Sequence, residues 1–161
     1  MSSRTQISNA PSSATALLAI AALFGGEKVL RRKLSGVMDA HQLLLDGLPA
    51  RALVHLIDSL LVLDKDTSLE KAVGMSVRTV QRRKEAHAKP LSAEQSGRVW
   101  SFASALAQAT TVFGSQRAAE EWLQRPALAL DGKRPLDLLA TPAGAALVET
   151  HLRRLEYGVY T

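Results

Sequence analysis

The sequence predicts an all-α protein. Its apolar residues recur at three- and four-residue steps, helix-capping residues mark the ends of segments, and no segment shows a secure strand pattern. Hydrophobic residues make up 47% of the 161 residues but aromatic residues only 4%, so the core must be aliphatic. Leucine and alanine, which dominate it, favour helices. A chain of this length suits one domain, or two small ones that share a core.

The first third of the chain contains a leader and up to four helices. Residues 1–13 are rich in serine, and we expect a flexible leader there. Residues 14–24 and 27–34 are predicted helices that stop at glycines, whereas residues 41–45 fit either a strand or a helix. Residues 49–62 begin at a proline and repeat leucine or isoleucine at helical spacing, which predicts an amphipathic helix.

The second half carries stronger capping signals. Ser92 precedes Glu94-Gln95 and a long apolar repeat that continues to residue 113, and a shorter helix is expected over residues 115–123. Pro135 opens one short turn. Thr141-Pro142 opens a last helix that should run to Tyr157, with Gly158 just after its end.

Residues 68–84 have the pattern of a helix-turn-helix. Gly74 supplies the sharp turn, Ser76 caps the second helix, and three valines are placed to pack between the helices. These valines are Val73, Val77 and Val80. The motif usually has a small residue four or five positions before the glycine, where Glu70 and Leu69 stand here. The first helix is therefore expected to be shortened or shifted.

The second helix of this pair is a candidate DNA-binding surface. Residues 76–89 contain five basic residues and one acidic residue, and clustered positive charge is typical of proteins that bind polyanions. Arginine can bridge the two major-groove acceptors of guanine, glutamine can pair with adenine, and the other residues can bind phosphates. The alternative is an ordinary solvated helix pair. The candidate DNA-binding residues are Ser76, Arg78, Thr79, Gln81, Arg82, Arg83 and Lys84.

Other classes of chemistry find little support. The chain lacks cysteine, and its four histidines show no metal-ligand spacing, so we expect no metal site. No nucleophile elbow, P-loop or dinucleotide-binding glycine pattern occurs, so we expect neither a cofactor nor an enzyme. His55 is expected to be a satisfied, partly buried histidine. A second basic cluster, residues 28–33, is expected to be a solvated face.

The chain is expected to be cytoplasmic and not to engage a membrane. Its longest wholly apolar run, residues 16–24, is too short for a membrane span, which takes about 20 residues. The run also resembles the core of a signal peptide. However, Gly25-Gly-Glu-Lys28 is a poor cleavage site, and a buried alanine- and leucine-rich helix explains the same residues.

From residue 113 onward the chain resembles the toxin-binding domain of the Xre/MbcA/ParS antitoxins. The residues 47–49 and 76–84 also match the Xre branch of this family, so the resemblance covers the chain from about residue 47. The C-terminal pattern consists of Phe113-Gly114, Ala119-x-x-Trp122-Leu123, Pro126, Leu130-x-Gly132-x-x-Pro135-Leu136-Asp137-Leu138-Leu139, Thr141-x-x-Gly144, Val148 and Leu155-Glu156-Tyr157-Gly158-Val159-Tyr160.

The resemblance implies an antitoxin of a type II toxin–antitoxin pair, whose partner is a RES-domain toxin that consumes NAD. The C-terminal part would cover the active site of the toxin and form a homodimer, while the Xre-like half would bind the promoter DNA of its own operon. Aromatic residues beside arginines are also enriched at interface hot spots. The candidate toxin-binding residues are Arg153, Arg154, Glu156, Tyr157, Gly158, Val159 and Tyr160.

We therefore expect residues 14–90 to form a helical region that contains the helix-turn-helix. Residues 91–161 would form the toxin-binding and dimerisation domain. Two alternatives remain open: a free-standing transcription regulator that uses its C-terminal half only for dimerisation or effector binding, and a pure inhibitor whose helix-turn-helix no longer binds DNA.

Overall fold

The computed structural model describes residues 13–65, 67–85 and 89–158, and within these ranges it is all-helical, as the sequence predicts. The only pairing of strand type there is an isolated bridge between Ala127 and Lys133. Nearly all of the expected leader lies outside the described residues. The helices are α1 (Ser13–Leu23), α2 (Glu27–Leu30), α3 (Val37–Asp46), α4 (Ala50–Ser59), α5 (Thr67–Val73), α6 (Val77–Glu85), α7 (Ala93–Phe113), α8 (Gln116–Leu123), the 3-10 helix η1 (Leu128–Leu130), α9 (Pro135–Leu138) and α10 (Pro142–Glu156).

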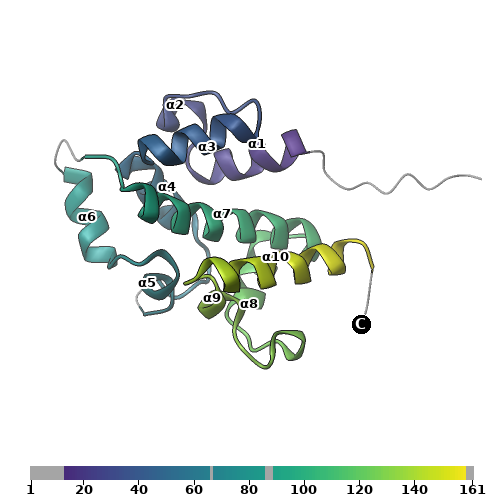
Figure 1. Ribbon diagram of the computed structural model, residues 1–161. Helices are drawn as coiled ribbons and strands as arrows, with labels where there is room; N and C mark the ends of the chain where they lie inside the picture. Colours follow the sequence, from purple (N-terminus) through teal and green to yellow (C-terminus); the bar gives the residue numbers. More distant parts are fainter. Residues whose placement is uncertain (1–12, 66, 86–88, 159–161) are drawn as a thin grey trace, which may run out of the picture.

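The long helix α7 forms the centre of the molecule, with α1 to α3 on one side and α8 to α10 on the other (Figure 1). It packs against α1, α3, α5, α8 and α10. The pair α5–α6 lies at the end where α7 begins, and the end of α10 lies at the opposite end of the molecule. The predicted DNA-binding and toxin-binding residues are thus far apart.

One continuous aliphatic core connects the two halves. Phe102 and Leu106 of α7 are fully buried in this core, which also contains leucines of the N-terminal helices and Leu152 of α10. A buried leucine contributes about 1.5–3 kcal/mol relative to an exposed one. Separation of the halves would therefore expose a large apolar surface.

The structure decides one element that the sequence left open and differs from the prediction in two others. Residues 41–45 belong to helix α3, which is capped by Gly36, whose backbone amide donates to Asp39, and which buries Ala40 and Leu43. The helix expected over residues 27–34 ends at Leu30, since Arg31 adopts a left-handed conformation at φ 53°.

The helix predicted over residues 49–62 ends at Ser59, three residues early. Leu60 is extended, at φ −69° and ψ 138°, and the backbone amides of residues 61–63 donate to the side chain of Glu120. A long-range hydrogen-bond acceptor thus replaces the last helical turn.

The predicted caps of the second half are confirmed. Ser92 Oγ accepts from the Gln95 amide at 3.1 Å, while Gln95 Oε1 accepts from the Ser92 amide at 3.2 Å. The hydroxyl of Thr141 accepts from the Gly144 amide at 3.0 Å, and Gly158 has φ +68° after the end of α10. These bonds satisfy amides at helix ends that lack an intrahelical partner.

Candidate nucleic-acid and protein-binding surfaces

Helices α5 and α6 form the predicted helix-turn-helix. Gly74 lies between them at φ +74°, a conformation that favours glycine, and the hydroxyl of Ser76 accepts from the Thr79 amide at 3.1 Å. Val73 and Val80 are both buried in the core, where α6 packs mainly on α4 and α5 packs on α7 and α9. The side chain of Val77, the third predicted valine, lies outside the described residues. As the departure from the usual motif suggested, α5 is short, with only seven residues.

The candidate DNA-contacting side chains lie on the outer face of α6. Arg78, Gln81 and Arg82 are exposed, and their spacing places them on one side of the helix. Thr79 is also exposed, but its hydroxyl lies 2.8 Å from that of Ser76 and belongs to the cap. Arg83 and Lys84 are part of α6, although their side chains lie outside the described residues. The arrangement presents two arginines and an amide to a polyanion.

Arg98 of α7 fixes the turn between the two helices, which the sequence did not indicate. Its guanidinium donates to the carbonyl of Lys71 in the last turn of α5 at 2.6 Å. A cation at a helix C-terminus is favourable because the exposed carbonyls there carry partial negative charge. A Cβ at Gly74 would overlap this guanidinium, so a larger residue there would displace the Arg98 side chain as well as strain the positive φ.

The second basic cluster is a solvated face, as expected. Lys28 and Lys33 are exposed, and Arg32 donates to Asp46 at 2.6 Å. The hydrogen bond from Arg32 holds the pKa of Asp46 below its usual value. The prediction that His55 is partly buried is wrong, because this residue is exposed. The prediction of a polar partner holds, since its Nδ1 lies 3.1 Å from the carbonyl oxygen of Leu23.

In the C-terminal half, Trp122 lies between two rings. Its centroid lies 5.3 Å from that of Phe113 and 6.0 Å from that of His151, which stacks on it at an interplanar angle of 20°. Burial and then the nearby charge of Arg154 lower the pKa of His151. The leucines of this half join the core. Leu123, Leu136 and Leu139 are buried, and Leu138 is partly buried.

The corner between α9 and α10 is tightly packed. Gly144 lies against the carbonyl group of Leu138, with no space for a Cβ. Arg134 forms a double hydrogen bond with Asp137 at 2.8 and 2.9 Å, which lowers the pKa of that carboxyl group. The corner therefore sets the direction of α10.

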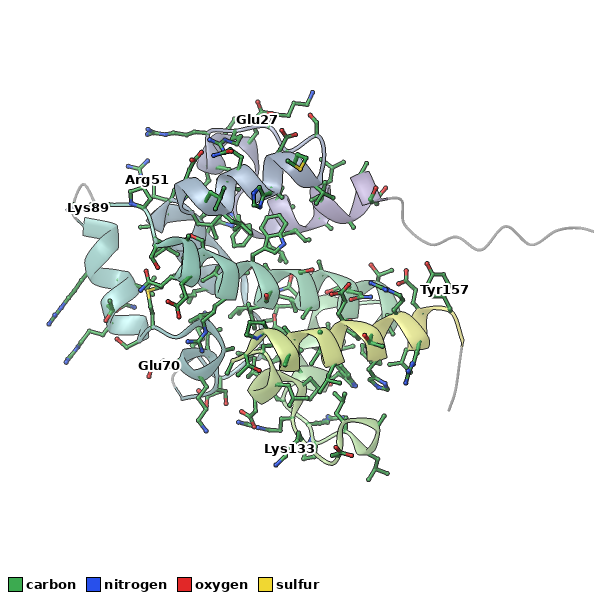
Figure 2. The ribbon with its side chains drawn as sticks, viewed as in Figure 1. Glu27, Arg51, Glu70, Lys89, Lys133 and Tyr157 are labelled. Atoms are coloured by element: carbon green, nitrogen blue, oxygen red, sulfur yellow. The ribbon has the colours of Figure 1, made fainter. Side chains whose placement is uncertain are left out.

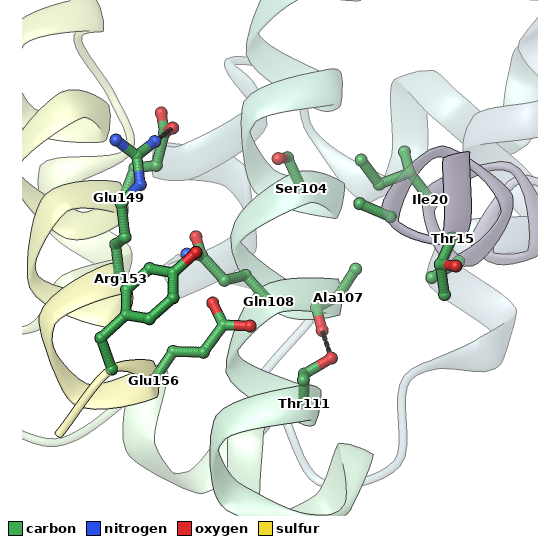
Figure 3. Close-up of a pocket in the computed structure, with 12 residues that line it drawn as sticks. Thr15, Ile20, Ser104, Ala107, Gln108, Thr111, Glu149, Arg153 and Glu156 are labelled. Atoms are coloured by element: carbon green, nitrogen blue, oxygen red, sulfur yellow. Dashed lines mark hydrogen bonds and ion pairs between the residues drawn. The ribbon is translucent and has the colours of Figure 1, made fainter. Parts of the chain in front are cut away.

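The last turn of α10 borders a groove. This groove, of about 300 Å³, lies over α7 between the start of α1 and the end of α10 (Figure 3). Arg153 and Glu156 line it together with Tyr157, whose side chain is 53% exposed. Arg153 also donates to Glu149 at 2.5 Å. On the opposite wall, α1 contributes apolar residues such as Ile20.

The predicted toxin-binding residues up to Gly158 lie in or just after the last turn of α10, and Figure 2 shows Tyr157 there, at one end of the molecule. Arg153, Arg154 and Tyr157 are exposed there, Glu156 is half-buried, and Gly158 follows at the surface. Val159 and Tyr160 lie outside the described residues. The contribution of α1 to the groove was not predicted, because no local signal connects segments about 140 residues apart.

Among the described residues, no three His, Cys, Asp or Glu side chains lie together in a way that could hold a metal ion. Over the same part of the chain, every helix is too short or too polar to cross a membrane.

In a comparison with known proteins, two family models match successive parts of the chain. Residues 39–104 match the antitoxin Xre-like helix-turn-helix domain, and residues 108–158 match the antitoxin Xre/MbcA/ParS C-terminal toxin-binding domain. The chain belongs to the Xre/MbcA/ParS antitoxin family. The two matches meet inside α7, so this antitoxin uses one helix to join its two domains.

Two curated relatives are similar to this antitoxin. "Antitoxin Xre" from Pseudomonas putida is 29% identical over 126 residues, which cover 78% of this chain and 76% of that protein. "Prs ADP-ribosylating antitoxin" from a Sphingobium species is 33% identical over 98 residues, which cover 55% of this chain and 61% of that protein. Both relatives are named as antitoxins.

Proposed function

We propose that this antitoxin neutralises a RES-domain, NAD-consuming toxin by covering its active site with the end of α10 and the residues that follow. We further propose that it binds the promoter of its own operon through α6, as a repressor and as a homodimer. It would act in the cytoplasm, without catalysis of its own.

The observation that carries the proposal for the toxin is the surface at the end of α10. Arg153, Arg154 and Tyr157 are exposed together beside a groove, within the match to the toxin-binding domain. Arginine and tyrosine are the residue types that dominate hot spots of protein interfaces. The name of the Sphingobium relative refers to ADP-ribosylation, which is also chemistry of NAD, so a toxin that acts on NAD fits both the resemblance and that relative.

Co-expression with the product of the neighbouring gene tests the proposal. The full chain should restore growth and retain the toxin in a pull-down, while a chain that lacks residues 156–161 should do neither. The truncation removes the proposed contact and leaves nearly all of α10 in place. Its circular dichroism spectrum should match that of the full chain. Full rescue by the truncated chain would exclude this end from the interface, and a neighbour without NAD-consuming activity would exclude the RES assignment.

The alternative of a free-standing regulator is favoured only by the basic face of α6. It predicts promoter binding without a toxin partner. Light scattering of the purified chain measures the dimer independently of both partners: a monomer at micromolar concentration would contradict the dimer.

A further inference from the structure

The side chain of Glu120 is fully buried, at 0% exposure, in the middle of α8. Acidic side chains are almost never fully buried without partners. Its partners here are mainly backbone amides. Oε2 accepts from the amides of Leu61, Val62 and Leu63 at 3.0, 2.7 and 2.9 Å. Oε1 accepts from the Leu61 amide at 3.0 Å and from the side-chain amide of Gln116 at 2.8 Å.

The neighbours of Glu120 on the same face of α8 bind the same segment. Gln116 donates to the carbonyl of Ser59 at 2.8 Å, and Gln124 accepts from the amide of Asp64 at 3.1 Å. Residues 116, 120 and 124 are four apart and therefore lie in one row along the helix. The row binds the backbone from residue 59 to residue 64.

We propose that Glu120 is a positioning residue for DNA binding: it holds the segment between α4 and α5 in place and so sets the position of the α5–α6 pair. The proposal rests on the promoter binding proposed above. Glu120 belongs to the toxin-binding domain, whereas residues 61–63 lead directly into the helix-turn-helix. One domain thus determines how the other presents its DNA-contacting face.

Two further hydrogen bonds from elements distant in sequence also hold α5 in place. Arg134, which is held by Asp137 near α9, donates to the hydroxyl of Ser68 at 3.3 Å in the first turn of α5. Arg98 of α7 binds the last turn of α5. The entrance, the start and the end of α5 are therefore each held by a side chain from outside the helix pair, and Glu120 makes the most bonds of the three.

A simpler role for Glu120 is to satisfy amides left over by the early end of α4, with no effect beyond stability. The variant Glu120→Gln separates the two roles because it nearly preserves the shape of the side chain. An amide offers one acceptor oxygen and one donor nitrogen. Whichever way it turns, the nitrogen faces either the amides of residues 62 and 63 or that of Gln116, so the segment must shift to avoid opposed donors.

The test uses the full chain and a labelled duplex that carries the sequence upstream of its gene, with a scrambled duplex for comparison. Glu120→Gln should weaken binding to the upstream duplex about tenfold, since a buried donor left unsatisfied has an effect of this order. Retention of the neighbouring toxin should stay unchanged. Backbone amide NMR signals of α6, which does not contact Glu120, should shift, while those of α10 should keep their positions.

The matched control is Glu121→Gln, the same change at the next residue. Glu121 is half-buried and forms a surface ion pair with Arg125 at 3.7 Å. It should leave DNA binding and the α6 signals unchanged. If Glu120→Gln does not fold, Gln124→Ala removes the adjacent bonds with a smaller perturbation and takes its place.

Unchanged DNA affinity and unchanged α6 signals in a folded Glu120→Gln chain would overturn the proposal. Equal loss of DNA and toxin binding would show a purely structural role and would overturn it as well. If the unsubstituted chain itself does not prefer the upstream duplex, promoter binding fails instead. The α6 signals then still decide whether Glu120 positions the helix pair.

Discussion

Helices α6 and α10 are both capped by a hydroxyl side chain, from Ser76 and Thr141, but they are supported in different ways. The support of α10 is mostly packing: the helix lies along α7 and against the corner around Gly144, and its His151 stacks on the ring of Trp122. Helix α6 packs mainly on α4, whereas α5 and the segment before it are tied to α7, α8 and the region of α9 by side-chain hydrogen bonds across 27 to 66 residues of sequence.

This difference matters because the two helices present different kinds of surface. On α6 the exposed residues are basic and act through charge, so a change in the position of the helix alters what it can contact. At the end of α10 the exposed residues flank a groove, and their effect depends on shape. A perturbation of the toxin-binding domain can therefore reach the DNA-binding surface through the hydrogen bonds to α5 and to the segment before it.

The largest effect is expected where the support of α10 is tightest. Gly144→Ala should lower the free energy of unfolding by about 3 kcal/mol, because its Cβ would overlap the Leu138 carbonyl and the backbone must move. Denaturant titration followed by circular dichroism measures this loss.

Gly97→Ala is the matched control for Gly144→Ala. Gly97 lies in the second turn of α7, and no atom other than those of its chain neighbours and its own helix backbone lies within 4 Å of the position of its Cβ. This change should instead stabilise the chain by about 0.5–1 kcal/mol, since alanine is a better helix former than glycine. Equal stability of the two variants would contradict the described α9–α10 corner.

Local signals account for most of the fold that the sequence predicted. Capping pairs such as Ser92 with Gln95, the glycine turn at Gly74 and the helical spacing of leucines depend on residues close in sequence, and the structure has them. The end of α4 was placed three residues too far along because its determinant, Glu120, lies about 60 residues away. Periodicity shows that a helix can continue, but not which distant acceptor ends it.

An intermediate effect is expected on α6. Arg78→Ala and Arg82→Ala should each weaken promoter binding by about 1–3 kcal/mol if these side chains contact DNA bases. If they contact phosphates, the affinity of the variants should instead depend less steeply on salt concentration. Fluorescence anisotropy over a salt series, with a scrambled duplex, distinguishes the two.

Arg117 is an exposed arginine on α8, and Arg117→Ala is the control for the loss of one positive charge. If it weakens binding as much as the α6 variants do, the effect is one of net charge and not of the helix-turn-helix. No preference of the unsubstituted chain for its promoter would leave only the pure inhibitor.

The two candidate surfaces were predictable to different degrees. Basic residues behind a capped glycine turn identify α6 from the sequence, because charge and turn chemistry are properties of the residues themselves. The groove beside Tyr157 was not predictable, since it exists only where α1 packs next to α10 across α7. Arg98 was missed for a similar reason: an arginine near the start of a long helix gives no sign that it binds another helix.

The smallest expected effect concerns pH and the ring cluster beneath α10. Burial, and then the charge of Arg154, lower the pKa of His151 below the ordinary histidine value of 6.5, so the folded chain disfavours the imidazolium. The unfolded chain then binds a proton first as the pH falls, and stability that is fully present above pH 6.5 declines below it.

His151→Gln should reduce this loss of stability between about pH 7 and pH 5, as seen in melting temperatures across that range. His41→Gln, on the exposed face of α3, controls for the removal of an imidazole and should leave the profile unchanged. A His151→Gln profile that falls as steeply as that of the unsubstituted chain would mean that the stacked ring on Trp122 does not contribute to the pH dependence of this half.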